Sequence, residues 1–119
     1  MKKICSLLTI LLLATLCFAA DPAEGFWISV DEKTKESTAG WKIWQENNVL
    51  YGKILSLAGK PQDGLTTGGS GKSYDNFQNG VDIGTLTTVG TTWIWDLKFQ
   101  EQGKWANGFI IDPAEGKRY

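Results

Sequence analysis

The side chains that most often carry out catalysis are scarce in this chain. It contains no histidine, and its two cysteines, Cys5 and Cys17, both precede residue 20. A Ser-His-Asp or Cys-His mechanism therefore lacks its usual general base. Carboxylates remain, and a glycosidase needs only an acid and a nucleophile or base, with aromatic rings to hold the sugar. The acids near Trp or Phe in the sequence are Glu24, Asp31, Glu46, Asp96 and Asp112. A glycan-hydrolysing or glycan-binding domain is thus one hypothesis.

Metal and nucleotide chemistry have little support in the sequence. Without His, and with both Cys near the N-terminus, a metal site would need carboxylates alone, and no stretch has the spacing of a calcium-binding loop. The run from Thr66 to Ser73 resembles a phosphate-binding loop, but Thr66 stands where that motif requires glycine. No helix is predicted after this run to hold a phosphate at its N-terminus. We therefore predict no metal and no cofactor.

Aromatic side chains are the most abundant candidates for a binding site. All six tryptophans follow residue 20, namely Trp27, Trp41, Trp44, Trp93, Trp95 and Trp105. One interpretation is that most of them fill the core of a β-barrel. The other is that some of them line a cavity for a small apolar ligand, since a barrel of about eight strands can enclose one. The candidates for this cavity wall are Trp27, Trp41, Tyr51, Trp93 and Trp95.

The strands that would position these aromatics are separated by clear turn signals. Asn47 and Asn48 tolerate the positive φ of a type I′ turn, so they predict a β-hairpin between residues 41–46 and 49–55. Other strands are predicted at 26–30, 81–89, 93–99 and 104–111, with the start of a further strand at 117–119. Trp93, Trp95, Leu97 and Phe99 alternate with polar or smaller residues, which predicts one buried face.

No stretch after Ala20 shows a sustained helical periodicity. The sequence therefore predicts an all-β fold, a small antiparallel up-and-down β-barrel, as one domain over residues 20–119. Residues at about 58–80 are rich in Gly, Ser, Thr and Asn and predict a long loop. Such a loop serves as a lid or binding loop in some proteins and is disordered in others, and the sequence leaves both readings open.

The N-terminus has the features of a secretory signal peptide. Lys2 and Lys3 precede an apolar run from Ile4 to Leu16, which is shorter than the roughly 20 residues that span a bilayer. We expect residues 1–19 to be removed, with cleavage after Ala19 or Ala20, and the protein to be periplasmic or extracellular. Leu16 before Cys17 is too bulky for the usual lipoprotein signal, so we do not expect anchoring through Cys17.

The charge balance excludes one large class of partner. Removal of Lys2 and Lys3 leaves ten basic residues against thirteen acidic ones, a net charge of −3. No basic stripe is present to neutralise phosphates, so nucleic acid is not a predicted partner. The expected mature chain also lacks cysteine, so disulfides cannot stabilise it and the aromatic core must.

Three segments together resemble a known family. They are Gly25-Phe26-Trp27, the hairpin segment Leu50-Tyr51-Gly52-Lys53-Ile54, and the final twelve residues from Gly108 to Tyr119. The last of these matches a pattern of Gly, an apolar pair, Asp-Pro, two variable residues, Gly-Lys and Tyr. The sequence thus resembles exported bacterial proteins that share domain of unknown function 2147.

This resemblance implies a lipocalin-like or calycin-like barrel, but no established activity. Family members typically continue for several strands past the Gly-Lys-x-Tyr element, so we expect a barrel that is incomplete at its C-terminus. Unpaired edge strands would then be exposed, and self-association through them is one expectation. The other expectation is that this chain is cut short relative to its domain.

These observations favour an exported, non-enzymatic β-barrel that binds a small apolar or amphipathic ligand, with the loop at 58–80 as a candidate lid. One alternative is a structural or interaction module of the cell envelope with a solid core, whose envelope partner the sequence does not identify. The other is the glycan-binding or glycan-hydrolysing domain raised by the carboxylates.

Overall fold

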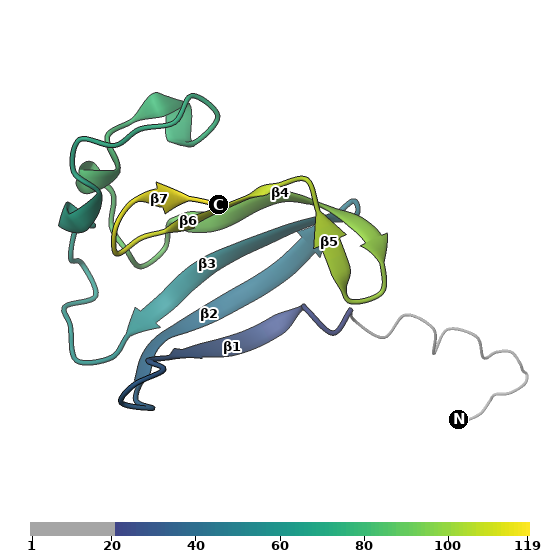
Figure 1. The fold of residues 1–119 in the computed structure, drawn as a ribbon, viewed down its shortest axis with the longest axis horizontal. Helices are drawn as coiled ribbons and strands as arrows, with labels where there is room; N and C mark the ends of the chain where they lie inside the picture. Colours follow the sequence, from purple (N-terminus) through teal and green to yellow (C-terminus); the bar gives the residue numbers. More distant parts are fainter. Residues whose placement is uncertain (1–20) are drawn as a thin grey trace, which may run out of the picture.

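The protein folds into one antiparallel sheet, in which strands that follow one another in the chain mostly pair side by side (Figure 1). The structure is a computed structural model, and it describes residues 21–119. Its strands are β1 (Gly25–Val30), β2 (Ser37–Glu46), β3 (Val49–Leu57), β4 (Thr92–Glu101), β5 (Lys104–Ala106), β6 (Phe109–Asp112) and β7 (Lys117–Arg118). The sheet order is β1-β2-β3-β4-β6-β7, and β5 pairs with β4.

This arrangement confirms the prediction of an all-β, antiparallel up-and-down fold. The sheet is not closed, because β1 and β7 each pair with only one strand of the described chain. The predicted signal peptide at residues 1–19, its cleavage site and Cys17 lie outside the described residues.

The β2–β3 hairpin forms as its turn residues predict. Asn47 and Asn48 both adopt left-handed φ, 53° and 64°, as a type I′ turn requires at both central positions. The strands then pair in regular register from Glu46 with Val49 to Trp41 with Ile54. Asparagine tolerates this conformation because its short polar side chain can bond to nearby backbone.

The predicted regular alternation along β4 is wrong, because a bulge interrupts the strand. Asp96 has a φ of 58°, and the pairing of β3 with β4 slips between Leu50 and Gly52. A bulge changes which way the following side chains point. Trp93 and Trp95 are accordingly buried, whereas Phe99 is 43% exposed.

The strand predicted at 81–89 is also wrong. Residues 58–91 form one long connection between β3 and β4 that contains three short 3₁₀ helices, η2 (Thr67–Gly69), η3 (Gln78–Gly80) and η4 (Ile83–Thr85). The Asp82 carboxylate accepts a hydrogen bond from Gly84 N at 2.8 Å and caps η4, which competes with an extended backbone. Only isolated bridges at Thr87 and Val89 remain of the predicted strand.

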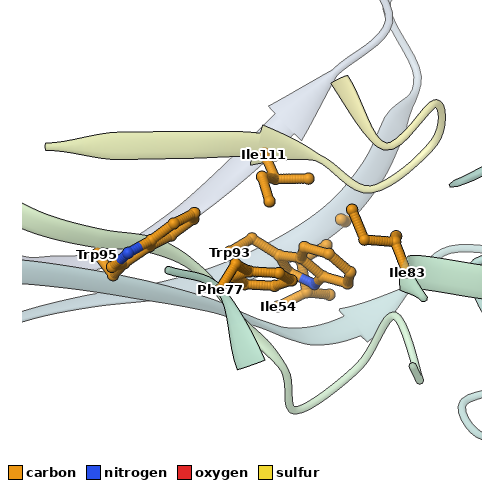
Figure 2. Close-up of a cluster of buried hydrophobic side chains, with 7 residues drawn as sticks. Ile54, Phe77, Ile83, Trp93, Trp95 and Ile111 are labelled. Carbon is orange, nitrogen blue, oxygen red and sulfur yellow. The ribbon is translucent and has the colours of Figure 1, made fainter. Parts of the chain in front are cut away.

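This connection is packed against the sheet. Phe77 is buried between two tryptophans of β4, with ring centroids 5.6 Å from Trp93 and 4.8 Å from Trp95. Figure 2 shows the resulting core, in which Ile83 from the connection and Ile111 from β6 also meet Trp93 and Ile54. The connection therefore supplies part of the core as well as covering it.

A backbone-to-backbone contact fixes the connection to the β6–β7 turn. A Cβ added at Gly68 would lie 2.0 Å from Ala114 O, so only glycine fits there. Nearby, Lys72 Nζ donates to Glu115 O at 2.7 Å and Tyr74 Oη to Gly116 O at 2.8 Å. The run that resembles a phosphate-binding loop thus has a structural role here, since its Gly68 and Lys72 contact the β6–β7 turn.

Hydrogen bonds from the start of the described chain also bridge the open sheet. The Asp21 carboxylate accepts hydrogen bonds from Gly103 N at 2.8 Å and from Trp105 Nε1 at 3.1 Å. Gly103 lies in the β4–β5 turn and Trp105 in β5, and this turn reaches toward the start of β1 (Figure 1). We call this contact the Asp21 latch. It joins the β1 side of the sheet to the β4–β5 hairpin without a strand pairing.

Candidate functional site

A half-open cleft of about 920 Å³ lies between the β1–β3 part of the sheet and the long connection. Its apolar side chains come from β2, β3, the residues after β3 and the β6–β7 turn, and they are Ala39, Trp41, Ile54, Leu57, Ala58, Pro61, Leu65, Pro113 and Ala114. The cleft is therefore built from segments that lie far apart in the sequence.

The sheet register places the apolar floor of the cleft. Trp41 on β2 pairs with Ile54 on β3, and Trp27 on β1 pairs with Trp41, so the three residues form one row across the sheet. β3 carries one extra residue between its pairings with Trp41 and with Gly40. Ala39 and Leu57 form the next pair, which also lines the cleft.

The rim of the cleft is polar. Hydroxyl groups come from Ser29, Thr34, Ser37, Thr38, Thr66, Thr67 and Thr88. Of these, Thr66 is buried, and its Oγ1 lies 2.9 Å from Leu86 O, so it also ties the connection together. An apolar floor with a polar rim suits an amphipathic molecule better than a purely apolar one.

Charged groups on the rim come from three places. Asp31 and Glu36 are the first and last residues of the β1–β2 connection. Asp112 is the last residue of β6, and Lys60 lies shortly after β3. Backbone N–H groups of Thr34 and Lys33 donate to the Asp31 carboxylate and hold its pKa below the ordinary value. Asp31 is therefore fully ionised at neutral pH.

Only one of the five predicted cavity residues lines this cleft. Trp41 does so, half-buried. Trp27 lies beside it on β1, is 48% exposed, and donates through Nε1 to Ala23 O at 2.8 Å. Tyr51 stacks on Trp44 with a centroid distance of 5.7 Å.

The remaining two predicted residues belong to the core. Trp93 is 0% exposed and donates through Nε1 to Thr88 O at 2.9 Å. Trp95 is stacked between Phe77 and Phe109, and its Nε1 has no hydrogen-bond partner within residues 21–119. The structure thus places Trp93 and Trp95 inside the buried core, and Trp41 against that core at the cleft, with Trp27 beside Trp41.

Sequence reasoning missed most of the floor and rim. Ala39, Ile54 and Leu57 follow from the hairpin pairing once its register is extended to the ends of β2 and β3. Thr66, Thr67 and Gly68 carry no local signal, because their position depends on the contact of Gly68 with Ala114.

The carboxylates considered for sugar chemistry are dispersed. Only Asp31 and Asp112 line the cleft. Glu24 accepts a hydrogen bond from Gln45 Nε2 at 3.0 Å, and Glu46 accepts one from Trp44 Nε1 at 2.8 Å. Asp96 lies at the β4 bulge. Within residues 21–119, no three acidic, His or Cys side chains gather as a metal site.

Residues 21–119 contain no helix that is long and apolar enough to cross a membrane.

Fold and cleft together define a class, an open antiparallel up-and-down β-sheet protein whose curved sheet and long connection enclose a cleft. Within that class the chain belongs to a bacterial family described as "Uncharacterized protein conserved in bacteria (DUF2147)", whose profile matches residues 25–119. No curated protein and no solved structure shows significant similarity to the chain.

Proposed function

We propose that this protein is an exported, non-enzymatic member of its family that holds a small amphipathic molecule in the cleft, in the periplasm or at the cell envelope. The observation that carries the proposal is the cleft itself, about 920 Å³ in volume with an apolar floor and a hydroxyl-rich rim. Small-molecule sites commonly measure about 300–1,000 Å³ and combine apolar lining with a few polar groups.

Two features of the sequence support the remaining parts of the proposal. The N-terminal twenty residues have the composition of a secretory signal. The chain contains no His, and its only cysteines precede residue 20, so the nucleophile and base pairs of most hydrolases are missing.

The test is binding of a neutral apolar fluorescent probe, N-phenyl-1-naphthylamine, to the secreted protein. Ala58 is exposed at the cleft, so Ala58→Trp should fill the cleft without disturbing the core. We expect saturable fluorescence enhancement in the wild type and at least a fivefold weaker Kd in Ala58→Trp. Lys104→Trp adds the same ring on exposed β5, outside the cleft, and should bind the probe like the wild type.

Absence of saturable binding in the wild type would refute the proposal. Equal binding by Ala58→Trp and the wild type would also refute it, because the probe would then be bound elsewhere. In both cases the alternative of a structural module with a solid core gains support, since the residues around Trp93 form a buried, packed cluster.

A further inference from the structure

The charges that line the cleft are unequal. Of the described residues that line the cleft, three are acidic, Asp31, Glu36 and Asp112, and one is basic, Lys60. The two acids of the β1–β2 side and the acid at the end of β6 belong to different elements, so negative charge borders the cleft on more than one side.

The floor carries a second feature that favours a cation. Trp41 is the one aromatic side chain within residues 21–119 that lines the cleft, and it is half-buried. The face of an indole ring attracts ammonium groups through its quadrupole, and tryptophan is the strongest of the aromatic residues in this respect. Leu57, which is half-buried and also lines the cleft, adds apolar surface to that of the ring.

We propose that the cleft prefers amphipathic molecules whose polar end is an organic cation, such as an alkylammonium group, over the corresponding anions. This inference rests on the proposed function, because it concerns the same cleft. The apolar part of the ligand contacts Leu57 and Leu65, and its cationic end lies between Trp41 and the acidic rim.

The size of the preference follows from simple electrostatics. A net charge of −2 acting over about 7 Å in a solvated cleft favours a monovalent cation over an anion by about tenfold at low ionic strength, once screening is included. The preference should shrink to about twofold at 0.5 M salt, because the Debye length is then only about 4 Å.

The experiment is competition against the bound neutral probe by three ligands of equal chain length: decyltrimethylammonium, decanoate and 1-decanol, each below its micelle concentration. We expect displacement by 1-decanol, and about tenfold tighter binding of the ammonium than of the carboxylate at low salt. The neutral alcohol reports on the cleft alone, whereas the ratio of the charged ligands reports on its charge.

Three variants assign the preference to the rim. Glu36 is exposed, and Glu36→Gln should lower the ratio of cation to anion affinity about twofold to threefold. Lys60→Gln removes the opposing charge and should raise the ratio by a similar factor. Glu101→Gln removes a carboxylate from the exposed end of β4, away from the cleft, and should leave the ratio unchanged.

The outcomes separate the two proposals. If 1-decanol displaces the probe but decanoate binds as tightly as the ammonium, the charge preference is wrong and the proposed function stands. An unchanged ratio in both Glu36→Gln and Lys60→Gln also overturns the preference. If no ligand displaces the probe, the proposed function itself fails.

Discussion

At the scale of single residues, close backbone contacts determine which positions tolerate a substitution. Gly108, just before β6, packs against the bulge of β4, where a Cβ would lie 2.3 Å from Leu97 N. The neighbouring atoms are backbone, so they cannot swing aside as a flexible side chain would. The bulge at Asp96 therefore requires glycine at position 108.

Gly108→Ala should lower the free energy of unfolding by about 1–3 kcal/mol or more, because the added methyl overlaps backbone that has no room to move. The measurement is the midpoint of urea unfolding, monitored by tryptophan fluorescence. Gly64→Ala is the matched control, since its Cβ would lie 3.4 Å from Pro61 O and should change stability by no more than about 0.5 kcal/mol. Equal midpoints for the two variants would contradict the contact.

At the scale of elements, the sequence predicted those structures that depend on interactions between residues close together in the chain. The β2–β3 hairpin could be read from Asn47-Asn48 because the turn conformation depends on those two residues. The strand at 81–89 could not be excluded, since the burial of Ile83 arises from packing against distant residues.

The same reasoning explains how much of the site was predictable. Trp41 was found because it alternates within a predicted strand, but Thr66–Gly68 and Asp112–Ala114 reach the cleft only through tertiary contacts. Periodicity identifies Trp41, Trp93 and Trp95 as inward-facing residues, but it does not show that Trp41 lines the cleft whereas Trp93 and Trp95 fill the core.

Asn48 provides the test at this scale. Asn48→Ala should cost about 1–2 kcal/mol, because alanine pays the steric cost of left-handed φ, whereas Asn48→Gly should be tolerated or slightly stabilising. Thermal unfolding by circular dichroism compares the two. A glycine variant as unstable as the alanine variant would show that the Asn48 side chain, and not its backbone conformation, stabilises the turn.

At the scale of the whole molecule, the sheet is open along its edges, and β1 exposes Phe26 at 77% and Ile28 at 66%. The Asp21 latch is what secures this side of the sheet to the β4–β5 hairpin. Self-association through the exposed edges stays a prediction.

The latch predicts how stability depends on pH. Hydrogen bonds from Gly103 N, Ala23 N and the Trp105 indole lower the pKa of Asp21 below its ordinary value. A lowered pKa in the folded state stabilises the protein above the unfolded value of about 3.9, and this contribution is lost as pH falls through the lower, folded pKa. Asp21→Asn should therefore lower Tm by a constant amount between pH 5 and 8.

As pH falls from about 4 through the lowered pKa of folded Asp21, the difference in Tm between the wild type and Asp21→Asn should shrink, because the wild type becomes protonated and then also carries a neutral side chain at this position. Differential scanning calorimetry across this range measures it. Asp31→Asn, which removes another carboxylate of lowered pKa, serves as the comparison away from the latch. A difference that persists undiminished at pH 2 would rule out charge as the source of the latch's contribution.

The latch also has a consequence for the time course of assembly. Asp21 meets Gly103 and Trp105 across 82 and 84 residues. Closing so long a loop costs more entropy than closing the two-residue turn of the β2–β3 hairpin. During synthesis from the N-terminus, β1 thus emerges first but cannot be latched until Gly103 has been added. β1 can pair with β2 early in folding, but its latch to the β4–β5 hairpin is among the last contacts to become possible.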